Sequence, residues 1–139
     1  MSIHDFAKGA MASSGRQLEQ VLAGLKEEHA DVKVGSIAMS ARETVAHLTD
    51  CYLCSVDAAE GKEPKFGSYS GAGKSWTELQ KELDESRAAA VDKILALPED
   101  KIGDFSLNYV ILHDAYHVGQ LALVRIQTDP NWDAYSIYA

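Results

Sequence analysis

Residues 40–59, SARETVAHLTDCYLCSVDAA, decide how this sequence of 139 residues folds. Ser40 and Glu43 have the spacing of a capping box, in which the two side chains bond free N–H groups at the start of a helix. Apolar residues then recur at steps of three and four residues, as they do along one face of an α-helix. The stretch therefore predicts a helix that carries His47 at the border of its apolar face.

The same patterns continue through the rest of the chain. Ser75 and Glu78 form a second capping-box pattern, and the helix that starts there must end before Pro98, because proline does not continue a helix. Apolar steps of three and four residues predict another helix over roughly residues 3–28. They predict a last one that begins between residues 106 and 108 and ends near residue 127. Alternation typical of strands is scarce, so we predict an all-α fold with four helices.

The connections between these helices limit their order. A helix of about 20 residues is about 30 Å long, and an extended chain covers about 3.3 Å per residue. Residues 60–74 can therefore return along the full bundle, which makes the second and third helices parallel. Residues 29–39 and 98–105 suit antiparallel neighbours. We predict one domain, residues 1–139, that is a four-helix bundle of up-down-down-up topology with a long crossover loop between helices two and three.

The charge of the chain excludes several classes of partner. It has 13 lysine and arginine residues against 21 aspartate and glutamate residues, for a formal net charge of −8. Nucleic acids and anionic membranes bind clusters of positive charge, and the sequence has no basic run. Its start lacks the features of a signal peptide, and no stretch approaches the roughly 20 apolar residues that span a bilayer. We therefore expect a cytoplasmic protein whose partner is a small-molecule substrate rather than nucleic acid or membrane.

Two histidines on the last predicted helix are the strongest chemical feature of the sequence. His113 and His117 are four residues apart, so both lie on one helical face, together with apolar residues that point toward the interior. One interpretation is that they are ordinary polar residues, one of them buried and hydrogen-bonded. His47, on the second helix, supplies a third imidazole. Three histidines from two facing helices would make an open metal site, with solvent in the remaining positions.

Four other residues near the histidines are candidates for a role in the site. Cys51 follows His47 by one turn and is a candidate fourth ligand, although a small buried cysteine in a helix usually serves as apolar filler. Glu43 and Asp50 are candidates for orienting a ligand or transferring a proton, and solvated charges on a helix flank are the alternative. Gln120 lies on the ligand face, where it could hydrogen-bond a ligand or a substrate. The candidate catalytic residues are therefore Glu43, Asp50 and Gln120.

These residues and their order resemble the DinB/YfiT-like family of four-helix-bundle metalloproteins. In that family a histidine on the second helix joins a His-x-x-x-His pair on the last helix. The matching stretches here are residues 40–48, SARETVAHL, and residues 113–121, HDAYHVGQL. The most specific part of the match is the ending from the last histidine to Gly-Gln, while the match on the second helix is short.

The resemblance implies a zinc or nickel ion on His47, His113 and His117, and frequently a homodimer. Several members of the family use the metal in transfer or isomerisation with low-molecular-weight thiols such as bacillithiol or mycothiol, whereas many others share only the fold and the metal site. Many members have a histidine and an arginine beside the last ligand, where this chain has Tyr116 and Val118. This difference leaves the metal triad intact, but substrate contacts through those two positions do not transfer.

Two functional hypotheses follow. The first is a metal-dependent enzyme of thiol transfer or hydrolysis, because a divalent metal with an open position lowers the pKa of a water or thiol that it binds, to about 7 for water on zinc. The second is a non-enzymatic dimeric bundle in which the metal is structural or the histidines bind a small effector. A further apolar row on the last helix, nearly opposite the histidines, predicts a homodimer through that helix. Its members are Ile111, Ala115, Val118, Ala122 and Ile126.

Overall fold

The computed structural model describes residues 1–139 and contains helices without any strand, which confirms the all-α prediction. The bundle has four long helices: α1, Ile3–Leu22; α2, Ala41–Ala59; α3, Trp76–Leu95; and a last helix made of α4, Glu99–Phe105, a π-helical segment η2, Ser106–Ile111, and α5, Leu112–Thr128. Two short 3₁₀ helices follow α1 and α5; they are η1, Glu27–His29, and η3, Ala134–Tyr138. None of the helices combines the length and the apolar character needed to cross a membrane.

Both predicted capping boxes form. The Ser40 hydroxyl accepts a hydrogen bond from the Glu43 backbone N–H at 3.1 Å, and the Glu43 carboxylate accepts one from the Ser40 N–H at 3.3 Å. Ser75 and Glu78 make the same reciprocal pair at the start of α3, at 3.1 and 2.9 Å. Each box bonds N–H groups that would otherwise have no partner within the helix. The starts of α2 and α3 are therefore confirmed.

Two other predicted helix boundaries are wrong. Helix α1 ends at Leu22 rather than near residue 28. Gly24, two residues later, has a left-handed conformation (φ +77°) through which an α-helix does not continue. The last helix begins at Glu99, so residues 99–105 are helical rather than part of a loop.

The π-helical segment explains why the start of the last helix was missed. The inner face of this helix has a buried residue at every fourth position: Ile102, Ser106, Val110 and Asp114. In a regular α-helix each step of four residues turns the side chain by about 40°, so three steps would carry Asp114 about 120° away from Ile102. The wider π turn of η2 takes up this drift and keeps all four side chains on the inner face.

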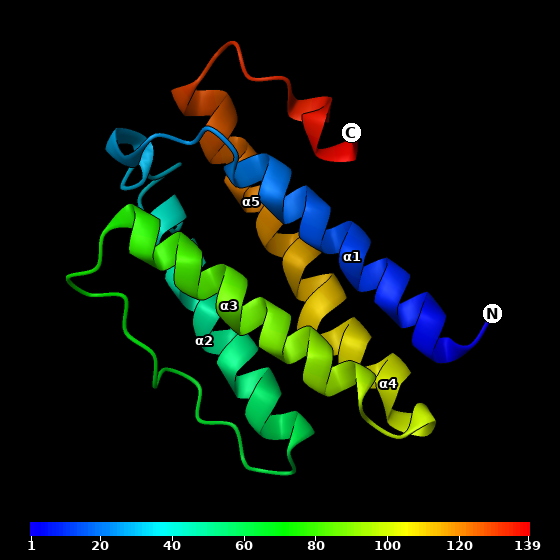
Figure 1. Ribbon diagram of the computed structural model, residues 1–139. Coiled ribbons are helices and arrows are strands. Elements are labelled where there is room, and N and C mark those ends of the chain that lie inside the picture. The colour runs from blue at the N-terminus through cyan, green and yellow to red at the C-terminus, as the bar shows by residue number, and fades with distance from the viewer.

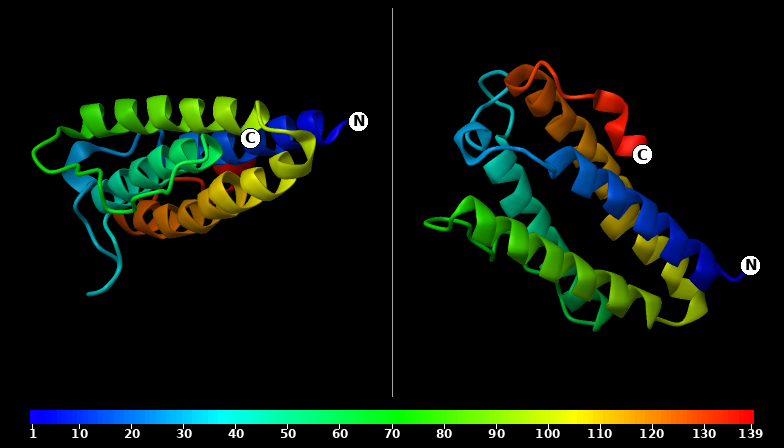
Figure 2. Two further views of the ribbon diagram at one scale, coloured as in Figure 1. Left: turned by 90° about the horizontal axis from the view of Figure 1, so that it is seen from below. Right: turned by 45° about the horizontal axis from the view of Figure 1, so that its top comes forward.

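The helices pack mainly as two pairs, α1 along α5 and α2 along α3 (Figure 1; Figure 2). The colours of Figure 1 show that α2 and α3 both begin at the end of the bundle where α1 finishes. Residues 60–75 run back along the outside of this pair. Arg125 of α5 is buried against the end of α1, where it donates hydrogen bonds to the carbonyl oxygens of Val21 and Ala23 at 2.9 and 2.7 Å. This contact holds the end of α1 on α5.

The core consists of two apolar clusters with a polar layer between them. The larger cluster includes Leu18 of α1 and Val118 of α5. The smaller cluster lies toward the start of α1, and its members are Ala7, Met11, Ile94, Ile102 and Val110. Ser14 and Asp114, which are both buried, lie between the two clusters along α1 and α5.

The polar layer is centred on the carboxylate of Asp114, which is fully buried. It accepts hydrogen bonds from the Tyr52 hydroxyl on α2, from the Ser14 hydroxyl on α1 at 2.8 Å, and from the Arg87 guanidinium on α3 at 2.8 and 3.2 Å. Burial and the adjacent Asp114 raise the pKa of Tyr52 above its usual range, so its hydroxyl remains a donor. All four long helices therefore meet at one carboxylate.

Gly15 makes room for Arg87 to reach this carboxylate. A β-carbon at position 15 would lie 2.6 Å from Nη1 and 2.8 Å from Cζ of Arg87, well inside van der Waals contact. Helix α1 has a second glycine, Gly9, where an added β-carbon would meet no atom within 4 Å. The Arg87 guanidinium therefore occupies space that Gly15 leaves open, whereas no side chain uses the space at Gly9.

We predict opposite effects of the two glycine-to-alanine substitutions in α1. Gly15→Ala should displace Arg87, leave the Asp114 carboxylate short of a partner and lower the free energy of unfolding by about 1–3 kcal/mol. Gly9→Ala should raise it by about 0.5–1 kcal/mol, because alanine favours a helix over glycine. Chemical denaturation of both variants and the parent protein measures the two changes. Equal changes would show that Arg87 does not need the space at Gly15.

Candidate metal centre

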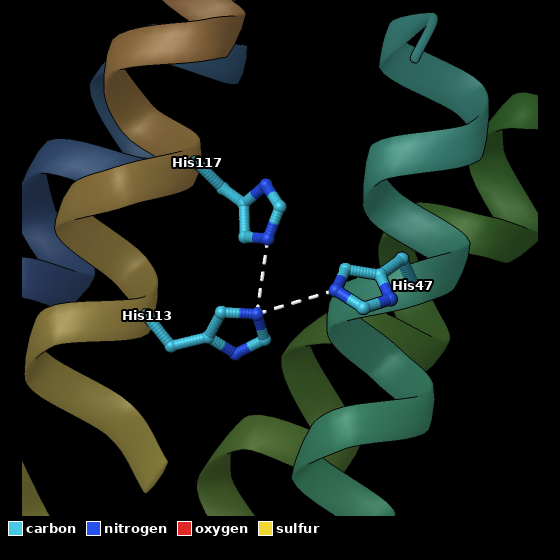
Figure 3. Close-up of side chains that lie close together, drawn as sticks. All are labelled: His47, His113 and His117. Carbon is cyan, nitrogen blue, oxygen red and sulfur yellow. Dashed lines mark hydrogen bonds between the residues drawn. The ribbon is translucent and has the colours of Figure 1, made fainter. Parts of the chain in front are cut away.

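Three histidine rings converge between α2 and α5 (Figure 3). His113 and His117 point from α5 toward α2, and His47 points from α2 toward them. The Nε2 atom of His113 lies 3.3 Å from Nε2 of His47 and 3.0 Å from Nε2 of His117. His117 is buried, whereas the other two residues are partly open to solvent. The structure therefore brings the three predicted ligands together.

The contact with Gln120 sets the tautomer of His117. The side-chain oxygen of Gln120 lies 2.7 Å from Nδ1 of His117, so Nδ1 carries the hydrogen and Nε2 presents its lone pair. Burial and then the neighbouring His113 lower the pKa of His117 to about 4. Burial and then His47 also lower the pKa of His113. Both rings are therefore neutral at pH 7, which is the form that binds a metal ion.

The positions of the nitrogens suit a metal ion better than hydrogen bonding among the rings alone. A single hydrogen on Nε2 of His113 cannot bridge to both of its neighbours. Bonds of about 2.0–2.1 Å to a tetrahedral zinc ion place the ligand nitrogens about 3.4 Å apart, close to the 3.0 and 3.3 Å of the two pairs that include His113, and all the ligand atoms lie within 4.8 Å of one another. Imidazole is a ligand that both zinc and nickel accept. The three side chains therefore fit a divalent metal ion.

Cys51 lies beside the triad without joining it. Its sulfur is 3.8 Å from Nε2 and 3.9 Å from Nδ1 of His47, but the group of mutually close ligand atoms consists of the three histidines. Burial, followed by the charges of Asp50 and Cys54, raises the pKa of the Cys51 thiol to about 12. Without a bound ion, the thiol form of Cys51 therefore dominates at neutral pH.

The two acidic candidates have partners elsewhere. Glu43 caps α2 and pairs with Lys33, whose ammonium nitrogen lies 3.3 Å from the carboxylate. The Asp50 carboxylate accepts hydrogen bonds from two backbone N–H groups of the 60–75 connection, at 2.8 and 3.0 Å, and so holds this connection against α2. Gln120 is the candidate catalytic residue that contacts a histidine of the triad. Roles of Glu43 and Asp50 in orienting a ligand or transferring a proton stay predictions.

Sequence reasoning missed Asp114, although it stands between the two histidines of the last helix. It directly follows His113, so its side chain turns by about 100° from the metal-site face into the interior. Its hydrogen bonds tie this turn of α5 to the other three long helices. The available signal was an acidic residue on the inner side of an apolar helical pattern, because aspartate is seldom fully buried without partners.

Comparison with known proteins agrees with the fold and with the place of the histidines. The sequence matches the DinB superfamily over residues 10–121, which covers most of the chain and all three histidines. No curated protein and no solved structure gives a significant match. The helical fold, with the histidine cluster shared between α2 and α5, is consistent with the family match. The chain therefore belongs to the DinB superfamily.

Proposed function

We propose that the protein is a divalent-metal-binding bundle of up-down-down-up topology, with zinc or nickel held by His47, His113 and His117. We further propose that it is a metal-dependent enzyme of thiol transfer or hydrolysis. The observation that carries the proposal is the convergence of three imidazole nitrogens, with separations of 3.0 and 3.3 Å from the central one. Membership of the DinB superfamily supports it, because metal binding by three histidines is what the family resemblance implies.

The surroundings of the triad suit a reacting site better than a structural one. Structural zinc sites are normally closed by four protein ligands, whereas three histidines leave a position for a small molecule. Partial exposure of His47 and His113 allows a small molecule to reach that position. Gln120 keeps the lone pair of His117 directed into the site. A divalent ion bound there supplies Lewis-acid chemistry and lowers the pKa of a water or thiol that it binds.

The substrate class that we propose is a low-molecular-weight thiol in a cytoplasmic setting. This choice follows the family resemblance and the acidic charge of the chain, which disfavours nucleic acid and anionic membranes. The competing hypothesis is a non-enzymatic bundle with a structural metal or a bound effector. It would gain support if Cys51 closed the site as a fourth ligand, but the group of mutually close ligand atoms consists of the three histidines without Cys51.

The purified protein should contain about one equivalent of zinc or nickel per chain. His47→Ala and His113→Ala should each lose most of this metal, because the two remaining imidazoles hold a divalent ion more weakly than three. His29→Ala removes a histidine outside the triad and should leave the metal content unchanged. Elemental analysis by mass spectrometry gives the three values. Metal retained in His47→Ala would refute a site shared by α2 and α5.

Turnover distinguishes the enzyme from the non-enzymatic bundle. We expect the metal-loaded protein to accelerate the reaction of a low-molecular-weight thiol with an aromatic chloride, or the hydrolysis of a nitrophenyl ester, as followed by absorbance. Removal of the metal with a chelator should lower the rate at least about tenfold, and His113→Ala should do the same. His29→Ala should keep the parent rate. Rates that do not depend on the metal would favour the non-enzymatic hypothesis.

We also propose a homodimer through α5, on a row of residues that shares Ile126 with the predicted row and otherwise differs from it. Most of the predicted row is used inside the chain, since Val118 belongs to the larger apolar cluster, Ala122 packs against it and Ile111 packs against the smaller one. Another row of α5 is open to solvent, and its large members are 51–64% exposed: Leu112, Tyr116, Leu123 and Ile126. With Gly119 they repeat at steps of four and three, which is the spacing of helix pairs in contact. A continuous exposed apolar row of this kind favours a contact with a second copy.

Light scattering after size exclusion should give about twice the chain mass of 15.1 kDa at micromolar concentration. Leu123→Glu should convert the protein to a monomer, because an unpaired charge is costly in an apolar contact. Phe6→Glu is the control, since Phe6 is also a large exposed apolar residue but lies on α1. A wild-type protein that is already monomeric would contradict the proposed contact.

A further inference from the structure

The contact between α2 and α5 carries the three histidines, yet it is less extensive than the other main contacts. Helix α2 packs chiefly on α3, and α5 packs chiefly on α1. Imidazole rings alone hold two helices together weakly, because each ring nitrogen can take part in one good hydrogen bond. Apolar residues of both helices share the larger cluster, and a directional contact would add a defined rotation and height of α5 relative to α2.

One hydrogen bond in the interior is a directional contact of this kind. Apart from the contact between His47 and His113, the side-chain hydrogen bond that joins α2 to α5 runs from the Tyr52 hydroxyl to the Asp114 carboxylate. Tyr52 lies five residues after His47 on α2, and Asp114 lies one residue after His113 on α5. At 100° per residue, both are turned from the histidine face into the core. The two helices are thus joined at an outer point, the histidines, and at an inner point, the carboxylate.

Two further hydrogen-bond donors hold the Asp114 carboxylate in place. Ser14 of α1 and Arg87 of α3 donate to the same carboxylate oxygen, at 2.8 Å each for their closest contacts, and Arg87 also donates to the Met11 carbonyl at 2.6 Å. A buried ion pair is often no more stabilising than an apolar contact of the same size, because both charges lose their hydration. The ion pair between Arg87 and Asp114 adds a defined orientation of the carboxylate, since hydrogen bonds to a carboxylate tolerate little misalignment.

We propose that Asp114 is the positioning residue of the metal centre: through Tyr52 it sets α5 against α2 so that His113 and His117 face His47. This inference rests on the proposed function, because it assumes that the triad binds a metal ion. Ligand distances in metal sites hold to within about 0.2 Å, so a small rotation of α5 is enough to weaken the site. Residues that hydrogen-bond a metal ligand directly typically account for 10–100-fold in metal affinity, and we expect an effect of up to this size when the helix that carries two ligands is displaced.

Two hydroxyl deletions test the proposal. Tyr52→Phe and Ser14→Ala each remove one hydroxyl donor from the same carboxylate, but the tyrosine alone joins α2 to α5. Cobalt(II) is titrated into the metal-free proteins and followed by its visible absorption, which reports affinity and ligand geometry. Thermal unfolding of the metal-free proteins reports stability. We expect Tyr52→Phe to weaken cobalt binding about 10–100-fold and to change the absorption spectrum, and Ser14→Ala to stay within about threefold of the parent with the parent spectrum.

The possible outcomes distinguish a positioning role of Asp114, a purely structural role of Asp114, and a protein that binds no metal. If Tyr52→Phe lowers the unfolding temperature but keeps the parent affinity and spectrum, Asp114 has a purely structural role and the proposal fails. It also fails if Ser14→Ala weakens cobalt binding as much as Tyr52→Phe does, or if Tyr52→Phe does not fold. If the parent protein itself does not bind cobalt, zinc or nickel, the proposed metal function fails and the positioning role fails with it.

Discussion

The interior of this bundle tolerates a charged carboxylate because three helices bring hydrogen-bond donors to it. A buried charge without partners is much less stable than the same charge in water, so Asp114 restricts how the helices can pack. Apolar side chains accept small shifts of one helix past another, whereas donors to a carboxylate must keep their distance and direction. The polar layer therefore fixes the relative height of the four long helices, and the two apolar clusters fill the space on either side of it.

The hydrogen bonds to Asp114 also restrict where the histidines lie, because one turn of α5 carries residues of both the polar layer and the histidine site. His113 and Asp114 are neighbours in the chain, and the ring meets His47 near solvent while the carboxylate meets Tyr52 in the core. Hydrogen bonds thus hold the Asp114 carboxylate in the core, while the histidine site on the outer side of the helix stays partly open to solvent. Such an arrangement suits a site that must keep its ligands in place while small molecules enter and leave.

Local patterns in the sequence predicted a large part of this architecture, and non-local contacts account for what they missed. Ser40 and Ser75 were sufficient to locate two helix starts, because capping depends on residues within one turn. The spacing of His113 and His117 likewise identified two of the three histidines of the cluster. The pairing of Arg87 with Asp114 could not be predicted in this way, because it depends on packing between different helices and on the space that Gly15 leaves.

The position of the exposed apolar row on α5 was misjudged for a related reason. Two apolar rows run along this helix, and the sequence alone does not tell which of them the rest of the chain covers. Val118 is taken up by the larger cluster, whereas Leu123 is left at the surface. When a helix has apolar residues on two sides, the side that is exposed to solvent can be identified only from how the neighbouring helices pack against it.

The π-helical segment also limits how the length of the last helix can change. Loss of one residue from Ser106–Ile111 would leave eleven steps between Ile102 and Asp114. At about 100° per residue these make about 1100°, close to three full turns, so a regular helix would keep both residues on the inner face. Gain of a residue would instead turn Glu99–Phe105 by about 100° relative to α5, so that either Ile102 would leave the smaller cluster or the histidines would leave the face toward α2. Insertions are therefore compatible with the fold at the two ends of this helix but not within it, while the 60–75 connection outside the bundle is free of this restriction.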